Sequence, residues 1–376
     1  MTNDEQGLVE RYELLGCIQC GKCSSGCPIS LKSALNIRRL VRELAIHRGR
    51  TAVYTRTELW DCTTCAACSL RCPRGLKPNE VIVGLRSHLV EEGGIPVTVR
   101  DALEGTFKHG NPWGRSRTRR SEWAAGLEIK DFSQGERAEL LYFVGCAPSY
   151  DPRVQEVARA LTRILKRAGL DFGILGNEES CCGNEIRRLG EEGLFEMLRE
   201  DNLKLFHEYG IEHIMTTSPH CFNVLKNEYQ DGSFEVKHYT QVLAELIEEG
   251  KLTPSQGVRK RVTYQDPCFL GKQNGVFEEP RFVLRSIPGI KLIEFERSRE
   301  RSLCCEGGGG RMWVEASDSG ERLAVVRIRE ALELGVEIVA TACPFCLLNL
   351  EDAVKTLGVA DQLQVKDIAE LLIEAI

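Results

Sequence analysis

The sequence predicts an α+β protein of several domains, in which a helical N-terminal domain precedes two repeated α/β lobes. The chain has 376 residues, which is more than one typical domain contains. Apolar residues recur at helical spacing in the first hundred residues, and short apolar strands alternate with amphipathic helices after Leu140. Cysteine positions in that second part recur after about 122 residues. We expect the N-terminal domain at residues 1–100, a linker at 101–137, lobe one at 138–255 and lobe two at 256–376.

The composition limits what the protein can be. Hydrophobic residues make up 42% and charged residues 28% of the chain, as in soluble globular proteins. The net charge of −6 argues against a nucleic-acid partner, which would favour a clustered basic surface. No run approaches the roughly 18 apolar residues that a membrane helix needs, and the N-terminus is too polar for a signal peptide. We therefore expect a cytoplasmic protein, which could lie on the cytoplasmic membrane through a partner subunit.

Cysteine is the informative residue type in this chain. There are 17 cysteines, and the cytosol keeps structural disulfides reduced, so this number indicates metal or redox chemistry. Core packing is the alternative, because free cysteine often behaves as a small buried hydrophobe. Adjacent cysteines followed by four glycines, in SLCCEGGGGRMW, make a poor packing unit but a suitable metal-ligand loop.

Two runs near the N-terminus share the spacing C-x2-C-x2-C-x3-C-P. They are CIQCGKCSSGCP and CTTCAACSLRCP. This spacing is typical of two cubane [4Fe-4S] clusters, in which the fourth cysteine of each run binds the other cluster. Zinc sites would instead show paired C-x2-C knuckles. We assign Cys17, Cys20, Cys23 and Cys72 to the first cluster, and Cys62, Cys65, Cys68 and Cys27 to the second.

Helices rather than strands are expected around these runs. Leucines recur at near-helical spacing in residues 31–50, and residues 78–94 carry apolar side chains on one helical face. Residues 1–100 therefore resemble the α-helical ferredoxin domain of succinate dehydrogenase-type iron-sulfur subunits. Lys22, Arg71 and Arg74 lie near the ferredoxin thiols, where they either raise cluster potentials or keep the surface soluble.

The predicted linker contains the arginine run RSRTRR at residues 115–120. It has few apolar residues and no clear period. A charge run of this kind is most often a solvated surface, and the alternative is a docking strip for an acidic partner.

Four apolar strands in the second part end in cysteine loops: LLYFVGC, HIMTTSPHC, RVTYQDPC and EIVATACPFC. Helical stretches follow them, which predicts βα units on a largely parallel sheet. Ligands in such sheets bind beyond the carboxyl ends of the strands, where these cysteines fall.

The cysteines of the two lobes correspond at a nearly constant offset of 122 or 123 residues. At this offset Cys346 falls opposite Val224, whose side chain cannot bind iron. Lobe two then has five thiols and lobe one has four. The lobe-two thiols are Cys268, Cys304, Cys305, Cys343 and Cys346, and the lobe-one thiols are Cys146, Cys181, Cys182 and Cys221.

The pattern of one cysteine, then Cys-Cys-Gly, then C-P-x-C is similar to the CCG cysteine-rich domain of heterodisulfide reductases. With the ferredoxin domain in front, the chain resembles the D subunit of heterodisulfide reductase. The same layout occurs in the iron-sulfur subunits of glycolate oxidase and anaerobic glycerol-3-phosphate dehydrogenase, and in the class II benzoyl-CoA reductase machinery. The resemblance implies a noncubane [4Fe-4S] cluster on the five thiols of lobe two, where a disulfide is cleaved one electron at a time.

Two residues depart from the family pattern. Glu306 stands where the motif has glycine, although Gly307–Gly310 still supply a flexible loop whose amides could reach cluster sulfurs. Val224 leaves lobe one without its fifth thiol. Lobe one is then a relic without a cluster, a four-thiol site, or a site completed by His220, and these alternatives stay open.

We expect the iron-sulfur subunit of an anaerobic redox complex. Electrons would pass through two cubanes to or from the lobe-two site, where the five thiols would support disulfide or dithiol chemistry. Partners would be a flavoprotein, or a membrane subunit that carries cytochrome b or reacts with quinone. No flavin or nicotinamide fingerprint is visible, since Gly307–Gly310 lack the G-x-G-x-x-G spacing.

Two alternatives to this function remain. In the first, the chain only transfers electrons between a flavoprotein dehydrogenase and a quinone, cytochrome or other carrier. In the second, it is a zinc-binding scaffold, for which zinc would replace iron and sulfide.

Overall fold

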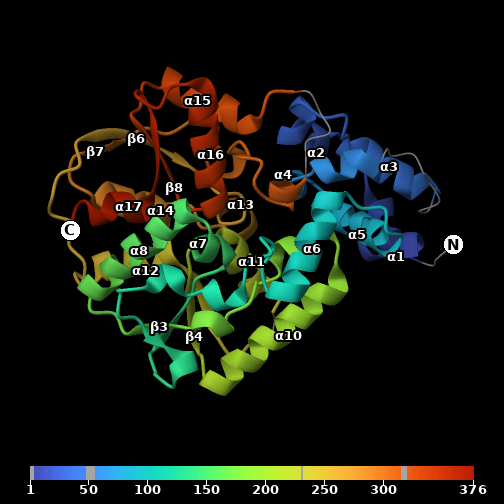
Figure 1. Ribbon diagram of the computed structural model, residues 1–376. Coiled ribbons are helices and arrows are strands. Elements are labelled where there is room, and N and C mark those ends of the chain that lie inside the picture. Colours follow the sequence, from blue (N-terminus) through green and yellow to red (C-terminus); the bar gives the residue numbers. More distant parts are fainter. Residues whose placement is uncertain (1–3, 48–55, 230–231, 315–319) are drawn as a thin grey trace.

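The computed structural model describes residues 4–47, 56–229, 232–314 and 320–376. Figure 1 shows a helical N-terminal region at one end and two α/β lobes beside it, with the C-terminus at the far end. Within these described ranges, no helix has the length and apolar character required to span a membrane.

In the described part of the N-terminal region, all regular secondary structure is helical. The longest ones bury an apolar stripe: Leu40, Val41 and Leu44 on one helix are at most 1% exposed. The two cysteine runs lie in loops and single helical turns between these helices. The helices are α1 (Asp4–Arg11), α2 (Lys22–Ser25), α3 (Ile37–His47), α4 (Ala67–Leu70), α5 (Pro78–Glu91) and α6 (Val97–His109).

Helix α6 begins just before the predicted linker of residues 101–137 and extends into it. It buries Val99, Ala102 and Leu103 and ends at Gly110, which adopts a left-handed φ of 67°. The arginine run that follows is mostly exposed, but Arg120 is buried and pairs with Glu179 at 2.7 Å. The prediction of a solvated charge run is therefore wrong for Arg120. The limits of the domains stay predictions.

Lobe one contains a parallel five-stranded sheet in the order β1-β3-β2-β4-β5. Its inner strands are almost continuous apolar runs because helices cover both faces. The strands are β1 (Lys130–Asp131), β2 (Leu140–Phe143), β3 (Phe172–Ile174), β4 (His213–Thr216) and β5 (Glu235–His238). The helices are α7 (Cys146–Tyr150), α8 (Pro152–Arg167), α9 (Asn184–Leu189), α10 (Glu192–Tyr209), α11 (Pro219–Asn227) and α12 (Tyr239–Glu248).

Lobe two contains a parallel four-stranded sheet in the order β7-β6-β8-β9, which is the order of lobe one without its edge strand β1. All four strands predicted before cysteine loops are present in the two lobes. The strands are β6 (Lys260–Gln265), β7 (Ile290–Leu292), β8 (Ile338–Thr341) and β9 (Gln364–Asp367). The helices are α13 (Gly271–Asn274), α14 (Glu278–Ser286), α15 (Leu323–Glu333), α16 (Pro344–Leu357) and α17 (Ile368–Ile373).

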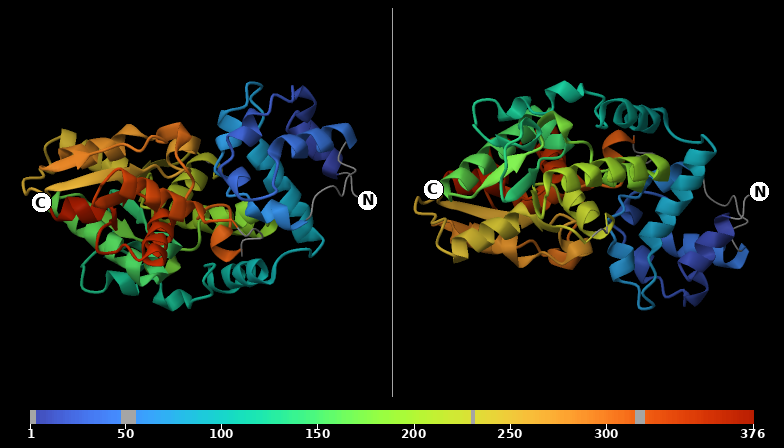
Figure 2. Two further views of the ribbon diagram at one scale, coloured as in Figure 1. Left: turned by 90° about the horizontal axis from the view of Figure 1, so that it is seen from above. Right: turned by 90° about the horizontal axis from the view of Figure 1, so that it is seen from below.

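The lobes pack on each other reciprocally. Helix α8 of lobe one contacts α17, the last helix of lobe two, and α12, the last helix of lobe one, contacts α14. Figure 2 shows the two lobes layered against each other, with the helical region beside both. The Tyr239 hydroxyl donates to Asp367 Oδ1 at 2.7 Å across this interface. The duplicated sequence therefore folds into a pseudo-symmetric pair.

The last cysteine loop of each lobe begins a helix in the same way. Helix α11 starts at Pro219 with Ser218 as its N-cap, and α16 starts at Pro344 with Cys343 as its N-cap. Cys221 and Cys346 are then the third residue of their helices. Ser218 therefore takes the place of Cys343, and Cys221 takes the place of Cys346.

The prediction that Val224 occupies the place of the missing thiol is wrong. Equivalent residues are 122 apart at Cys146 and Cys268 but 125 apart at Cys221 and Cys346, because lobe two has a longer intervening chain. Val224 lies farther along α11 with a fully buried side chain. Lobe one still lacks a fifth thiol, but a serine hydroxyl stands in that position.

Candidate metal centres

The first group of four thiols comes from both N-terminal runs. A cavity of about 380 Å³ is lined by Cys17, Cys20, Cys23 and Cys72, and Cys27 is not among its lining residues. These are the four thiols assigned from the spacing to one cubane. Cys20 is the only one of the 17 cysteines that is exposed, and all 17 lie in the described part of the chain.

The second group consists of Cys27 with Cys62, Cys65 and Cys68. The last three are at most 8% exposed. Burial raises the pKa of Cys62 to about 12, and the nearby Arg86 guanidinium opposes this rise. Cys27 lies close enough to Cys65 to raise its own pKa by charge repulsion, after the larger effect of burial. Each set of four thiols therefore combines three cysteines of one run with the fourth of the other.

Arg86 on α5 is fully buried between three parts of the molecule. Its five N–H groups all donate to backbone carbonyls, so the side chain is completely satisfied. The acceptors are the carbonyl oxygens of Leu59 at 3.1 and 2.8 Å, Cys62 at 2.7 Å, Arg188 at 2.9 Å and Gly309 at 2.8 Å. Arg86 therefore joins the second cysteine run to lobe one and to lobe two.

Two of the four glycines at residues 307–310, Gly308 and Gly309, pack directly against the second cysteine run. Gly309 has a left-handed φ of 67°, and a Cβ there would lie 2.7 Å from the carbonyl carbon of Thr63. The Gly310 amide donates to Glu185 Oε2 of lobe one at 2.6 Å. The expected flexible loop is instead a tight contact that only glycine permits.

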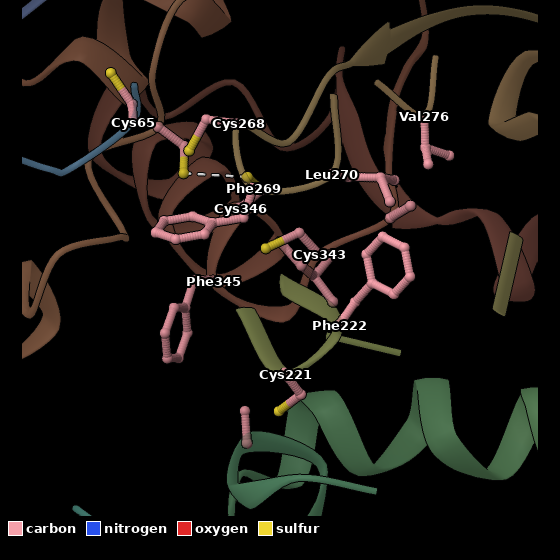
Figure 3. Close-up of a cluster of buried hydrophobic side chains, with 14 of the residues drawn as sticks. Cys65, Cys221, Phe222, Cys268, Phe269, Leu270, Val276, Cys343, Phe345 and Cys346 are labelled. Atoms are coloured by element: carbon pink, nitrogen blue, oxygen red, sulfur yellow. Dashed lines mark hydrogen bonds between the residues drawn. The ribbon is translucent and has the colours of Figure 1, made fainter. Parts of the chain in front are cut away.

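This contact brings the N-terminal thiols against those of lobe two. The Cys65 and Cys304 thiols are hydrogen-bonded, which is the largest cause of the raised pKa of Cys65. Cys304 Sγ also donates to Thr63 Oγ1 at 3.4 Å. Figure 3 shows the sulfur atoms of Cys65, Cys268 and Cys346 on one side of the view, whereas Cys221 lies apart on α11.

All five lobe-two thiols converge from three loops and are buried. Cys346 Sγ donates to Cys305 Sγ at 3.1 Å. Hydrogen bonds from Cys304 and Cys346 lower the pKa of Cys305 to about 5. Burial raises the pKa of Cys343, but Cys346 and His220 lower it to about 5. A buried group of five soft sulfur donors suits an iron-sulfur cluster.

Glu306 adopts a left-handed φ of 66°, where lobe one has Gly183 with a φ of 79°. Such a conformation costs a non-glycine residue roughly 1–3 kcal/mol. The carboxylate compensates, because it pairs with Lys32 Nζ at 2.9 Å and accepts the Leu323 amide at 2.9 Å. The residue that departs from the motif thus ties lobe two to the N-terminal region.

The lobe-one thiols form a separate group. Cys146, Cys181, Cys182 and Cys221 line a cavity of about 410 Å³ together with Ser218. Hydrogen bonds from Cys146 and Cys182 hold the pKa of Cys181 well below its usual value. The buried Arg120 donates from both Nη atoms to Cys146 Sγ at 3.6 Å.

His220 lies between the lobes. Its Nδ1 is bonded to Glu185 Oε1 at 2.6 Å, and its ring stacks on Phe269 with centroids 4.3 Å apart. Burial lowers its pKa, but Glu185 and Cys343 raise it to about 10. His220 thus lines the lobe-one cavity, while its side chain interacts with Glu185 and with Cys343 of lobe two. Its role as a ligand in lobe one stays a prediction.

The thiol groups suit polynuclear clusters better than single ions. In the described ranges, no three His, Cys, Asp or Glu side chains converge as a single metal ion requires. The cysteine sulfurs are soft donors, which match iron in a sulfide cage.

Three residues near these thiols were not foreseen from the sequence. The signal for Ser218 was the proline that follows it, since S-P-x-C aligns with C-P-x-C once the offset is allowed to change. Arg86 and Arg120 gave no local signal, because their partners lie in other parts of the chain.

Comparison with known families agrees with this arrangement. A family model described as a 4Fe-4S dicluster domain matches residues 13–76, and one described as a cysteine-rich domain matches residues 140–226 and 262–351. The D subunit of the dihydromethanophenazine:CoB–CoM heterodisulfide reductase of Methanosarcina barkeri is 34% identical over 309 residues, which cover 79% of this chain and 73% of that protein. The chain therefore belongs to the family of iron-sulfur oxidoreductases that includes this D subunit.

Two further relatives of the family are longer proteins. The probable iron-sulfur-binding oxidoreductase FadF of Bacillus subtilis is 40% identical over 305 residues, and the EtfAB:quinone oxidoreductase of Syntrophomonas wolfei is 39% identical over 308 residues. Both alignments cover 78% of this chain and 43% of the relative. The chain thus spans less than half the length of these two relatives.

Proposed function

We propose that the chain is the iron-sulfur subunit of a redox complex and that it passes single electrons between a partner protein and lobe two. Its N-terminal thiols would hold two cubane [4Fe-4S] clusters in the two sets of four described above. The five thiols of lobe two would hold a noncubane [4Fe-4S] cluster. The observation that carries this proposal is the hydrogen bond from Cys304 Sγ to Thr63 Oγ1 at 3.4 Å, because Thr63 lies between Cys62 and Cys65 and the bond therefore joins the second cubane site directly to lobe two.

The partner would dock at the first cubane site. Cys20 is exposed there, and Ile18, Arg38 and Arg74 line the same cavity and are exposed. No acidic residue occurs from Leu14 to Arg42, although the whole chain carries a net charge of −6. A basic rim around a small apolar patch favours a partner with an acidic surface and speeds its association.

Positive side chains lie beside the thiols through which we propose that electrons pass. Their charge stabilises the reduced form of each cluster, which is more negative than the oxidised form. The clusters, when bound, supply one-electron steps at potentials between about −700 and +450 mV. Arg86 contributes its charge beside Cys62. Buried Lys272, whose Nζ donates to the Ser302 carbonyl at 2.6 Å, acts in the same way on Cys268.

At lobe two we propose disulfide or dithiol chemistry at Cys268, Cys304, Cys305, Cys343 and Cys346. Reduction of a disulfide breaks one S–S bond, consumes two electrons and two protons, and yields two thiols. The route through the N-terminal sites would deliver these electrons one at a time. The relationship to the D subunit of heterodisulfide reductase supports this chemistry.

A pure electron-transfer role is the second candidate. Two observations favour it: all five lobe-two thiols are buried, and a relative 39% identical is named an EtfAB:quinone oxidoreductase. In this case a flavoprotein dehydrogenase would be the donor, and a quinone, cytochrome or other carrier would accept the electrons.

One assay separates the two candidates. The chain, purified without oxygen and reduced by a viologen dye, is offered an organic disulfide or a water-soluble quinone. Disulfide reduction that disappears in Cys305→Ser, with the cubane EPR signals retained, supports chemistry at lobe two. Quinone reduction without disulfide reduction supports the electron-transfer role. An iron content of about eight per chain, enough for only two clusters, would refute the lobe-two cluster.

A further inference from the structure

We propose that Ser218 supplies its hydroxyl oxygen as the fifth ligand of an iron-sulfur cluster in lobe one, beside the thiolates of Cys146, Cys181, Cys182 and Cys221. This inference rests on the proposed function only in taking lobe two as the five-thiol reference. The first support is position. Ser218 and Cys343 each lie two residues after a central strand, precede a proline and cap a helix.

The second support is the cavity. Ser218 lines the same space of about 410 Å³ as the four lobe-one thiols. This space is similar in size to the cavity of about 380 Å³ at the first cubane site. Val224 is not among its lining residues, whereas Asn184, Glu185 and His220 are. Glu185 and His220 are hydrogen-bonded to each other at 2.6 Å, and Asn184 bonds to both, so Ser218 is the hydroxyl that faces the cavity beside the four thiols.

The third support is the chemistry of the hydroxyl. Ser218 is only 9% exposed, and its Oγ accepts the Cys221 amide at a long 3.5 Å. A hydroxyl has two acceptor lone pairs, so one remains for a metal. The positive end of α11 stabilises negative charge at this N-cap. On binding, the O–H bond breaks as an O–Fe bond forms, and the proton leaves to solvent as it does from the thiols.

The fourth support is the charge around the site. Buried Arg120 donates to Cys146 Sγ and pairs with Glu179. Glu179 in turn accepts the amides of Val144 and Gly145, both at 2.8 Å, in the turn before Cys146. Besides its pairing with Glu179, the Arg120 guanidinium therefore offers N–H donors to Cys146, and such hydrogen bonds would stabilise a negative cluster.

An oxygen ligand would make the two lobes electronically different. Oxygen is a harder donor than sulfur and favours the oxidised iron. The lobe-one cluster would therefore have a lower midpoint potential than the same site with five thiolates. An electron shared between the lobes would then reside on lobe two.

The test compares three variants of the full chain, purified without oxygen and loaded with ⁵⁷Fe. Ser218→Cys restores the five-thiol pattern, Ser218→Ala removes the fifth donor, and Val224→Cys is the control, since it adds a thiol to the same helix away from the cavity. We expect wild type and Val224→Cys to contain about 16 irons with identical Mössbauer spectra. Ser218→Cys should keep this iron content and raise the midpoint potential of one cluster, and Ser218→Ala should alter the spectrum of that cluster alone.

Three results would overturn the inference. Identical spectra for wild type and Ser218→Ala would show that the hydroxyl is not a ligand. A wild-type content of about 12 irons, unchanged by Cys182→Ser, would show that lobe one is empty. A spectral change in Val224→Cys equal to that in Ser218→Cys would remove the positional argument. Neither the second nor the third result touches the lobe-two cluster, which fails separately if iron falls to about eight per chain.

Discussion

The two lobes differ most at one turn that is otherwise built alike. Lobe one has Ser218 and His220 where lobe two has Cys343 and Phe345. The middle residue of each turn crosses to the other lobe: His220 reaches Cys343, and Phe345 lines the cavity of lobe one. Their rings meet with centroids 4.9 Å apart. The duplication therefore did not yield two independent sites, because each lobe contributes a wall or a charge to the other.

The N-terminal region also treats the lobes unequally. It touches lobe two through thiols, at Cys65 and Cys304, but it contacts lobe one through an ion pair between Glu80 and Arg188 at 3.1 Å. Only lobe two therefore offers a short route between sulfur ligands. Substitutions that exchange residues between the lobes can show whether this asymmetry is functional.

The largest effect is expected from giving lobe two the serine of lobe one. Cys343→Ser should abolish turnover, because it removes a soft ligand from the site that we propose to be catalytic. Cys182→Ser should disrupt lobe one and leave turnover measurable. The cubane EPR signals of both variants serve as the folding control. Equal loss in both variants would contradict the assignment of separate roles.

The second-largest effect is expected when the buried ion pair of lobe one, Arg120 with Glu179, is broken. Arg120→Met leaves the Glu179 carboxylate buried without a counter-charge, which should lower the free energy of unfolding by about 3 kcal/mol. Adding Glu179→Gln should recover most of this loss. Urea unfolding of both variants under anaerobic conditions measures the difference. If Arg120→Met were as stable as the wild type, the ion pair would not be what holds lobe one together.

An intermediate effect is expected when lobe one receives the aromatic residue of lobe two. His220→Phe removes the protonated donor beside Cys343, and a charged hydrogen bond is worth about 1.5–3 kcal/mol. At about 59 mV per tenfold change, the midpoint potential of the lobe-two cluster should fall by about 60–130 mV. Potentiometric EPR titration measures this shift, with the cubanes as internal references. An unchanged potential would mean that His220 serves packing alone.

The smallest effect is expected when lobe two receives the glycine of lobe one. Glu306→Gly relieves the left-handed backbone but removes the carboxylate that pairs with the buried Lys32 ammonium. Combined with Lys32→Met, it should change the free energy of unfolding by no more than about 1 kcal/mol, because replacing a whole buried pair is often neutral. Unfolding midpoints of the double variant and of Glu306→Gly alone give the comparison. A large loss in the double variant would show that the pair itself holds the N-terminal region in place.

Local patterns predicted what depends on local chemistry. The strands before the cysteine loops followed from short apolar runs, and the division of the N-terminal thiols into two sets followed from their spacing. The register of the last loop could not be obtained from a constant offset, since chain length between equivalent elements varies freely in loops. Pro219 and Pro344 were the better guides, because proline fixes the first turn of a helix.

Contacts between distant segments were beyond sequence reasoning. The glycines at residues 307–310 were interpreted as a flexible loop, but Gly308 and Gly309 pack against the Cys62–Thr63 backbone, which lies about 245 residues earlier. Arg120 was expected to be solvated because its neighbours in the chain are, and its acidic partner is 59 residues away. In both cases tertiary packing decides the environment, and a single sequence carries no sign of it.

The hydrogen bonds of Arg86 have a consequence for how the protein is made. Its side chain is synthesised early, yet one of its acceptors is the carbonyl of Gly309. Until that residue has left the ribosome, the guanidinium beside Cys62 keeps an unsatisfied donor and needs water. The second cubane site would therefore reach its final, dry form only after Gly309 has been synthesised, and its cluster would be fully enclosed only then.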